Sequence, residues 1–476
     1  MGSAWWRQRA VDVVEALREK RVTPLELVRS ARRRIEEVEG KINAVPTTCF
    51  ERAERRAREM DHPASPPRGY LYGLPVLIKD TLAVSGVRFT RGSLVHEHDV
   101  ADHDDPVVSV LEAKGAIIMG KTNTPEYGLG SNTYNDVFGE TLNPFDIRLT
   151  CGGSSGGAAS ALAAGEAWIA IGTDLGGSLR IPASFCGVVG LRPTPGVVPN
   201  AGSRTAAEDN LHAVVGPMAR NVTDLALLMD AISEKHPEDG NSVGAGDGES
   251  YVDRLKAYRE NLPTTIAWSS DLGGSVPMQG EVARICERAA KELARIVGAA
   301  FVDEACMDLS KGRETFHVLR AEMFKDKGAL LHHEDVVKPE LIWQVNQGLS
   351  LKDSDLDRAR ESHKKLLEST LDFFQSHDLL CSPCTMVPPF DVKTRWLREC
   401  EGWELETYID WLLPTSVLSL TNCPSISLPC GFTEAGLPVG LQLTAPASKE
   451  AELMCAAYAY ERANGHHEVV PIDPRP

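Results

Sequence analysis

Apolar positions near the start of the chain recur at intervals of three and four residues, which is the spacing of one helix face. Thr23, Pro24 and Glu26 supply a capping box with a proline in the first turn, so a helix is predicted to begin there. The first 65 residues are therefore predicted to be helices that turn one face to a core. The apolar stripe of this helix consists of Val28, Ala31, Ile35, Val38 and Ile42.

The pattern changes after residue 70 to short runs that are wholly apolar. Val76 to Ile78 and Trp168 to Ile171 are predicted to be interior strands. The alanine-rich segment 158–164 is predicted to be a helix of small residues that packs closely. Such an alternation from 70 to 200 predicts an α/β fold with a mostly parallel or mixed sheet. Segments 281–297 and 356–374 are predicted to be further helices.

Two clusters of glycine and serine lie where these predicted elements end, at 152–157 and 176–178. Glycine lets the backbone approach a bound group closely, and a serine hydroxyl beside it is a candidate nucleophile or proton relay. The apolar helix and strand between the clusters argue against a flexible linker. A phosphate-binding loop would end in Gly-Lys-Ser/Thr, which neither cluster does.

The first cluster also satisfies the G-x-S-x-G pattern of a nucleophile elbow. In that alternative the chain would be an α/β-hydrolase with Ser154 as its nucleophile. The predicted helix after Ser154 fits this alternative, whereas segment 144–150 before it has the composition of a poor buried strand. The residues alone leave both interpretations open.

Lys79 ends the predicted strand of Val76 to Ile78. A lysine at the mouth of a buried strand is desolvated, and desolvation lowers the pKa of its amine. The neutral amine is a competent general base. The alternative is a solvated lysine, or one paired with Asp80. Together with the two serine clusters, Lys79 is predicted to be part of a proton relay.

These segments resemble the amidase signature hydrolases. The resemblance rests on Gly73–Asp80, on Gly152–Gly157 and on Gly172–Ala183. Weaker similarity is found at 120–126, 424–429 and 436–443, so it extends from about residue 20 to about 460, with little between 235 and 400. The fold implied is a central mixed β-sheet flanked by helices on both faces.

The resemblance also implies roles for individual residues. Ser178 aligns with the nucleophile, and Ser154 with a bridging serine that follows a cis peptide bond. Lys79 aligns with the base that accepts a proton through Ser154. The backbone N–H groups of one loop align with the oxyanion hole, and that loop consists of Leu175, Gly176, Gly177 and Ser178.

Three neighbouring residues are expected to support this site. Asp174 and Arg180 flank the loop and are predicted to hold its shape. Ser155 is predicted to be a helix cap or a supporting hydrogen-bond donor.

The acyl pocket is expected at the loop that follows Pro125. Its predicted substrate-binding residues are Tyr127, Gly128, Leu129 and Gly130. This loop has no Arg or Lys to pair a substrate carboxylate, which predicts uncharged and partly apolar substrates. Arg313 or Arg320, if either reached the pocket, would instead select an amide that carries a carboxylate.

The whole chain, 1–476, is expected to be a single domain. Its parts are N-terminal helices at 1–65, a catalytic core at 70–230, a variable substrate-side region at 235–400 and a return to the core at 405–465.

Charge and cysteine content narrow the range of partners. A net charge of −17 argues against nucleic acid and against an anionic membrane surface as binding partners. The sequence also lacks a run of about 18 apolar residues, so no membrane-spanning helix is predicted. Eleven cysteines without framework spacing, and no signal peptide, predict reduced thiols in the cytoplasm. Cys381 and Cys384 lack a second pair, so neither a metal nor a cofactor is expected.

The predicted function is a serine hydrolase that cleaves carboxamide C–N bonds through an acyl-enzyme. Its substrates are predicted to be small uncharged aryl or alkyl amides, with carbamates or esters as related substrates. A homodimer is one oligomeric state that the sequence permits. One alternative is the glutamine-hydrolysing subunit of a tRNA-dependent amidotransferase, although an Asn-Leu-Ala-Arg-Tyr-Asp-like block is not found. Another is a non-catalytic interaction protein on the same fold.

Overall fold

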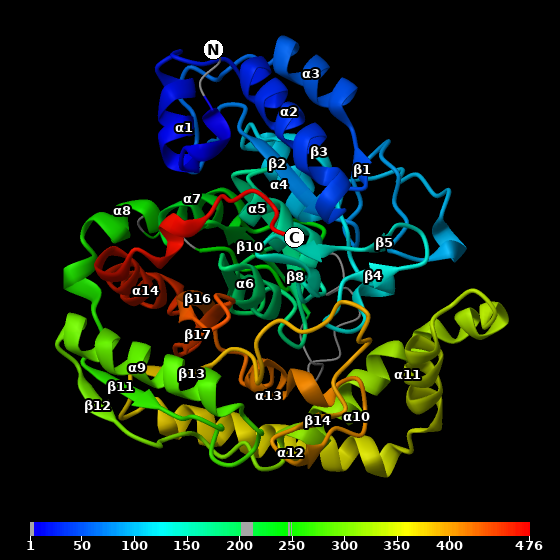
Figure 1. The fold of residues 1–476 in the computed structure, drawn as a ribbon, viewed down its shortest axis with the longest axis vertical. Helices are drawn as coiled ribbons and strands as arrows, with labels where there is room; N and C mark the ends of the chain where they lie inside the picture. The colour runs from blue at the N-terminus through cyan, green and yellow to red at the C-terminus, as the bar shows by residue number, and fades with distance from the viewer. Residues whose placement is uncertain (1–3, 201–212, 246–247, 249) are drawn as a thin grey trace.

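The computed structural model describes residues 4–200, 213–245, 248 and 250–476 (Figure 1). The predicted N-terminal helices are present as η1 (Trp5–Arg7), α1 (Ala10–Arg18), α2 (Pro24–Ile42) and α3 (Phe50–Glu59). The capping box of α2 is confirmed, because the Thr23 N–H donates to the Glu26 carboxylate at 2.8 Å and the Glu26 N–H donates to the Thr23 hydroxyl at 3.3 Å. The predicted apolar stripe of α2 is buried.

One sheet of eleven strands crosses the molecule, in the order β1-β3-β2-β8-β10-β9-β16-β17-β13-β11-β12. Its strands are β1 (Thr47–Thr48), β2 (Pro75–Lys79), β3 (Ile117–Thr122), β8 (Ile169–Asp174), β9 (Val189–Arg192), β10 (Val214–Ala219), β11 (Thr265–Trp268), β12 (Ala300–Val302), β13 (Leu379–Pro383), β16 (Ser425–Phe432) and β17 (Pro438–Thr444).

The sheet is mixed, as predicted. β2 runs parallel to β3 and β8, and β11 runs parallel to β12 and β13, whereas the remaining pairs are antiparallel. Ile78 of β2 lies opposite Ile171 of β8. Because these two strands are parallel, Lys79 and the residues that follow Ile171 reach the same edge of the sheet.

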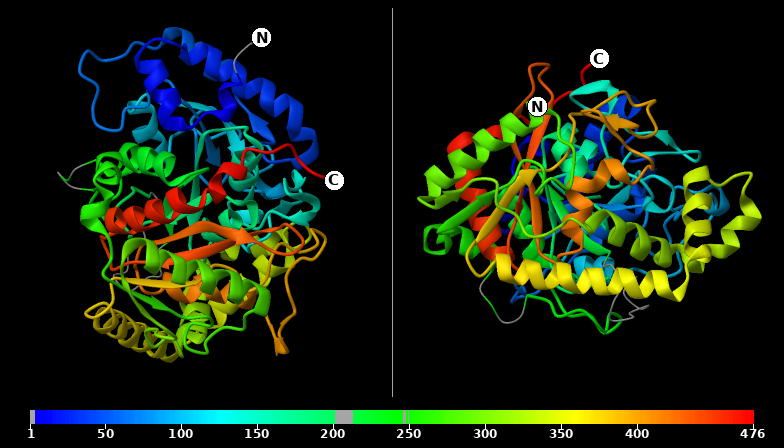
Figure 2. Two further views of the ribbon diagram at one scale, coloured as in Figure 1. Left: turned by 60° about the vertical axis from the view of Figure 1, so that its left-hand side comes forward. Right: turned by 90° about the horizontal axis from the view of Figure 1, so that it is seen from below.

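Helices lie on both faces of the sheet (Figures 1 and 2). α5 (Gly156–Ala164) packs on β8 and α6 (Arg180–Cys186) on β9, β16 and β17, and both helices are fully buried. The other main helices packed around the sheet are α4 (Pro106–Ala113), α7 (Val222–Ile232), α8 (Tyr251–Lys256), α9 (Gly280–Val297) and α14 (Glu450–Asn464).

Small residues let α5 pack as closely as predicted. A Cβ atom on Gly157 would lie 2.4 Å from the backbone nitrogen of Asn123. A Cβ atom on Gly172 would lie 2.5 Å from the Ser155 hydroxyl oxygen. Both contacts are too short for any side chain, so these glycines allow the first cluster to lie against β3 and β8.

A second hydrophobic cluster includes side chains from four helices, which lie in the lower part of the view in Figure 1. Its helices are α10 (Gly312–Phe324), α11 (Pro339–Ser350), α12 (Asp353–Phe373) and α13 (Leu413–Ser419). The helices predicted at 281–297 and 356–374 are thus confirmed as α9 and α12.

Short elements complete the chain. The 3₁₀ helices are η2 (Leu94–His96), η3 (Glu126–Gly128), η5 (Tyr258–Asn261), η6 (Lys325–His333), η7 (Asp410–Leu412) and η8 (His466–Val469). Three two-stranded ribbons pair β4 (Tyr134–Asn135) with β5 (Gly139–Glu140), β6 (Leu142–Asn143) with β7 (Asp146–Thr150), and β14 (Glu399–Cys400) with β15 (Trp403–Glu404). No helix in the described ranges is long and apolar enough to cross a membrane.

Candidate active site

Lys79 ends β2 and is completely buried. Its ammonium donates hydrogen bonds to three hydroxyls, at 2.6 Å to Ser154, 3.0 Å to Ser155 and 2.9 Å to Thr173. Burial lowers the pKa of Lys79 to about 7, and the negative charge of Asp174 opposes that shift only in part. Near neutral pH this amine can therefore both accept and return a proton.

The first glycine–serine cluster holds two serines in different roles. The Gly153–Ser154 peptide bond is cis, as the resemblance implied. The Ser155 N–H donates to the carbonyl of Ser178 at 3.0 Å, which joins this cluster to the second one. Ser155 is the N-cap residue of α5 by position, but its side chain makes no capping hydrogen bond. The other alternative, a supporting donor, agrees with the structure, because the Ser155 hydroxyl donates to the Thr173 carbonyl at 3.3 Å and accepts from Lys79 at 3.0 Å.

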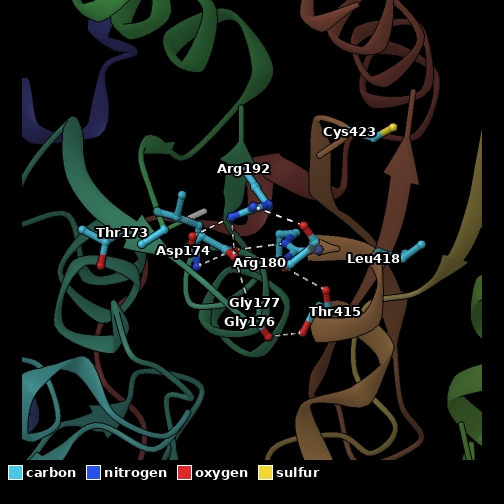
Figure 3. A network of polar contacts seen from close by, with 12 residues as sticks. Thr173, Asp174, Gly176, Gly177, Arg180, Arg192, Thr415, Leu418 and Cys423 are labelled. Carbon is cyan, nitrogen blue, oxygen red and sulfur yellow. Dashed lines mark hydrogen bonds and ion pairs between the residues drawn. The ribbon is translucent and has the colours of Figure 1, made fainter. Parts of the chain in front are cut away.

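Asp174 anchors the second cluster from the end of β8 (Figure 3). Its carboxylate accepts from the Arg180 guanidinium at 2.9 and 3.0 Å, and from the N–H groups of Gly177 at 2.9 Å and Leu179 at 3.1 Å. Arg192 donates to the Asp174 carbonyl at 2.6 Å. The predicted role of Asp174 and Arg180 in shaping the loop is confirmed by these contacts.

The same arginine links the loop to the C-terminal part of the chain. Arg180 donates to Gln442 of β17 and to Ser419 of α13, each at 2.8 Å. Burial alone would raise the pKa of Asp174, but Arg180 and Arg192 hold the pKa of that carboxyl well below its usual range. Asp174 is thus ionised and committed to structure.

Two glycines let neighbouring groups approach the loop at 175–178. A Cβ atom on Gly176 would lie 3.0 Å from the Phe316 ring, and one on Gly177, where φ is 118°, would lie 2.0 Å from the Thr415 hydroxyl. Thr415 in turn donates to the carbonyl of Gly176 at 2.7 Å (Figure 3).

The geometry corrects one part of the predicted oxyanion hole. The Gly177 N–H is turned to Asp174, so it is not aimed at a substrate. The N–H groups of Leu175, Gly176 and Ser178 have no hydrogen-bond acceptor within the described part of the chain. These three remain as candidate oxyanion donors.

The predicted substrate loop lies directly against the first cluster. The side of Gly128 where another residue would carry its side chain faces Ser154, since a Cβ atom on Gly128 would lie 3.5 Å from the Ser154 hydroxyl oxygen. Tyr127 adopts the left-handed region with φ 52°, and its hydroxyl bonds His96 at 2.6 Å. Leu129 is buried in the second hydrophobic cluster, whereas Gly130 is partly exposed.

A sequence model of the family described as Amidase matches residues 26–454. The chain belongs to the amidase family. This amidase is 34% identical to the glutamyl-tRNA(Gln) amidotransferase A subunit of Thermosynechococcus vestitus, over 92% of this chain and 94% of that protein. The corresponding protein of Moorella thermoacetica is 33% identical, over 97% and 98% of the two chains.

Solved structures show the same fold. A bacterial aryl acylamidase of the amidase signature family superposes with a TM-score of 0.87 at 24% identity, and covers 98% of this amidase and 99% of its own chain. A 6-aminohexanoate cyclic dimer hydrolase, solved with its substrate, superposes with a TM-score of 0.82 at 26% identity, over 97% and 98% of the chains.

The α/β-hydrolase alternative is therefore wrong. The strand before Ser154, β7, forms a two-stranded ribbon with β6 and lies outside the eleven-stranded sheet. A nucleophile elbow needs its serine directly after a strand of the central sheet. The G-x-S-x-G match at 152–156 arises from a glycine-rich turn with another geometry.

Several residues at this site were not predicted. Thr173 supplies one of the three hydroxyls around Lys79, and its sequence signal is its place within the Gly172–Ala183 segment that carries the resemblance. Lys338, from a region with little family resemblance, donates to the carbonyl of Leu129.

The two arginines considered for binding a substrate carboxylate both have partners within the protein. Arg313 donates to Glu406 and Asp410, and the buried Arg320 donates to Gln344 and Tyr408.

The cysteines take no part in a metal site within the described residues, where no group of three or more His, Cys, Asp or Glu side chains is placed to hold an ion. All eleven are free thiols.

Proposed function

We propose that this amidase hydrolyses carboxamide C–N bonds through an acyl-enzyme on Ser178. The observation that carries the proposal is the contact between Lys79 and Ser154 at 2.6 Å. Lys79 has no carboxylate in ion-pair contact among the described residues, and its pKa of about 7 makes it available as a base.

The proton path follows from this contact. The neutral amine of Lys79 takes the Ser154 hydroxyl proton while Ser154 takes the proton of Ser178, whose oxygen attacks the amide carbon. The N–H groups of Leu175, Gly176 and Ser178 stabilise the oxyanion. When the C–N bond breaks, the proton returns through Ser154 to the leaving amine. Water then attacks the acyl-enzyme and releases the carboxylic acid and free Ser178.

The preferred substrates are proposed to be uncharged aryl or alkyl amides, with carbamates and esters as related substrates that pass through a similar tetrahedral intermediate. Two features support this. Phe316 packs against Gly176, and Tyr127 and Leu175 belong to the apolar side chains around the second hydrophobic cluster. Arg313 is occupied by two carboxylates, which removes one of the two arginines considered for binding a substrate anion.

Activity-based labelling tests the assignment of the nucleophile. A fluorophosphonate should modify Ser178, as located by peptide mass spectrometry, and Ser178→Ala should abolish both labelling and hydrolysis in a screen of anilides, aliphatic amides, carbamates and esters. Ser154→Ala should keep a fold of unchanged stability but react slowly. A label on Ser154 with Ser178 unmodified would contradict the proposed roles.

A second candidate is the hydrolysis of glutamine as one component of an amidotransferase. It is supported by the similarity to the A subunits of glutamyl-tRNA(Gln) amidotransferases over more than nine tenths of the chain. A glutaminase assay separates the two candidates. Release of ammonia from glutamine at a higher kcat/KM than from a neutral anilide would favour the second.

A further inference from the structure

The peptide group between Gly176 and Gly177 is held at both of its polar atoms (Figure 3). Its carbonyl accepts from the Thr415 hydroxyl at 2.7 Å, and its N–H donates to the Asp174 carboxylate at 2.9 Å. A peptide group is planar, so two contacts on its opposite sides fix the direction of that plane. The loop at 175–178 is therefore clamped at its centre by one residue near it in sequence and by one residue 239 positions away.

The orientation of this peptide group depends on its two hydrogen bonds. It lies between two glycines, so no side chain on either neighbour restricts its rotation. The Thr415 hydroxyl occupies the space that a side chain at position 177 would need, because a Cβ atom on Gly177 would lie 2.0 Å from that oxygen. The glycine thus admits the hydroxyl to the backbone, and the hydroxyl supplies the restraint that the glycine lacks.

The clamped peptide lies between two of the three candidate oxyanion donors. The Gly176 N–H belongs to the peptide group before it, and the Ser178 N–H to the peptide group after it. The direction of one donor relative to the other depends on the dihedral angles of Gly176 and Gly177, so the clamp sets that direction. The Ser178 carbonyl accepts from the Ser155 N–H at 3.0 Å, and the Ser155 hydroxyl accepts from Lys79, which joins the clamped loop to the proton relay.

Thr415 is itself held by the network that holds Asp174. The Thr415 carbonyl accepts from the Ser419 hydroxyl at 3.1 Å, and the Ser419 hydroxyl accepts from Arg180 at 2.8 Å. Arg180 pairs with the Asp174 carboxylate, which accepts from the Gly177 N–H. These contacts form a closed ring from Thr415 back to the clamped peptide. Its side chains are all buried, so the ring is shielded from water.

The Thr415 hydroxyl has a second carbonyl within reach, which belongs to Leu412 at 3.0 Å. A hydroxyl has a single O–H to donate. The contact to Gly176 is the shorter one and has the usual length of an O–H···O hydrogen bond. A threonine that served only α13 could donate to Leu412 alone, so its approach to Gly176 indicates a role for the loop.

We propose that Thr415 is a positioning residue for the oxyanion hole. Its hydroxyl holds the Gly176–Gly177 peptide in the plane that turns the N–H groups of Gly176 and Ser178 toward the carbonyl oxygen of the substrate. Thr415 acts through the backbone and does not touch the substrate. This inference rests on the proposed hydrolysis through Ser178, because the oxyanion forms in that reaction.

Two variants that differ in one hydroxyl test this role. Thr415→Ser keeps the O–H group and Thr415→Ala removes it, while both lose the methyl group. With a neutral anilide, Thr415→Ala should have a kcat about 10²-fold below that of Thr415→Ser, because a small misplacement of groups around the reacting atoms costs that much. KM should stay nearly the same, since the oxyanion is absent from the bound ground state.

Thr370 of α12 provides the matched control. Its hydroxyl is buried and donates to the Leu366 carbonyl at 2.8 Å, within the helix. Thr370→Ser and Thr370→Ala should therefore have the same kcat.

A second readout does not depend on turnover. The Ser178 oxygen adds to the carbonyl carbon of phenethyl trifluoromethyl ketone, the Ser178 proton passes through Ser154 to Lys79, and the ketone oxygen becomes an oxyanion. The corresponding carbinol is close in shape and cannot undergo this addition. Fluorine NMR titration measures the affinity for both compounds. Thr415→Ala should bind the ketone about 10²-fold more weakly than Thr415→Ser does, and the carbinol equally well.

The outcomes separate this inference from the proposed hydrolysis. Equal kcat and equal ketone affinity of Thr415→Ala and Thr415→Ser would overturn the role of Thr415, whether or not the wild type hydrolyses amides. A loss of ketone and carbinol affinity by the same factor would also overturn it, because Thr415 would then only maintain the fold. The expected difference in ketone affinity, in a protein that hydrolyses no amide, would support the role of Thr415 and contradict the proposed function. A wild type without affinity for the ketone would contradict both.

Discussion

Two buried lysines flank the proposed site, and their surroundings differ. Lys79 lies at a strand end in the sheet, and hydroxyls of Ser154, Ser155 and Thr173 accept from it. Lys338 lies at the start of α11, among aromatic rings, and has one backbone carbonyl as its acceptor. Burial lowers the pKa of both, to about 7 and about 8.

The difference shows that burial alone does not define the role of a lysine. The acceptors around the nitrogen decide it. Hydroxyls that can themselves pass on a proton make Lys79 suited to a relay, whereas the backbone carbonyl that accepts from Lys338 cannot pass one on. Lys121 illustrates a third outcome, because its buried ammonium is paired with Asp80 at 2.8 Å and serves the fold.

The largest expected effect separates the two lysines by rate. Lys79→Ala should lower kcat by about 10²–10⁴-fold, because a positioned general base contributes that much. Steady-state kinetics with a neutral anilide, alongside Lys338→Met, provides the comparison. A Lys79→Ala enzyme as active as Lys338→Met would contradict the role of Lys79 as the general base.

The pH dependence of kcat/KM should report Lys79. Below its pKa of about 7 the amine is protonated and cannot accept a proton, so the rate should fall about tenfold per pH unit and level off above pH 7. At pH 5 this amounts to roughly a hundredfold loss. A profile that is flat from pH 5 to pH 8 would remove Lys79 from the rate-limiting proton transfer.

Lys338 should instead be visible in the pH dependence of stability. Its folded pKa of about 8 lies below the ordinary 10.5, so between these values the unfolded chain binds more protons and stability rises with pH. From pH 7 to pH 9.5 the wild type should gain about 2 kcal/mol in free energy of unfolding relative to Lys338→Met. Urea unfolding at both pH values measures it, and a constant difference would contradict burial of the charge.

The smallest expected effect concerns the hydroxyls around Lys79. Thr173→Val removes one acceptor from the ammonium and therefore disfavours it. The acid limb of the rate profile should move to lower pH by about 0.5–1 unit, since a hydrogen bond contributes about 0.5–1.5 kcal/mol. Thr173→Ser keeps the hydroxyl and should restore the original position of the limb.

Much of the proposed site could be predicted because its signals are local. The apolar run before Lys79 predicts burial, and the small residues of α5 and Gly172 predict close packing of the first cluster against the sheet. Both expectations agree with the structure. The mixed sheet was also predicted, although its strand order was not, since register between distant segments is absent from local patterns.

The direction of single hydrogen bonds could not be predicted. Gly177 was grouped with its neighbours as an oxyanion donor, but its N–H is turned to Asp174, which depends on the backbone dihedrals of the loop. Lys338 was missed for another reason. Its burial results from the packing of α11 against a loop more than 200 residues earlier. The local sequence around Lys338 does not distinguish it from the exposed lysines of the same region.

The strand order has a consequence for how the protein is made. β9 pairs with β16, and β16 and β17 together join it to β13, so in the part of the chain that the structure describes the two halves of the sheet are connected through residues 425–444. At 5–20 residues per second the ribosome needs roughly 10–45 s to reach β16 after β9 has been synthesised. Throughout that interval β9 presents an open edge to other chains. A chain that is released before residue 425 is therefore expected to aggregate, even though it already contains Lys79, Ser154 and Ser178.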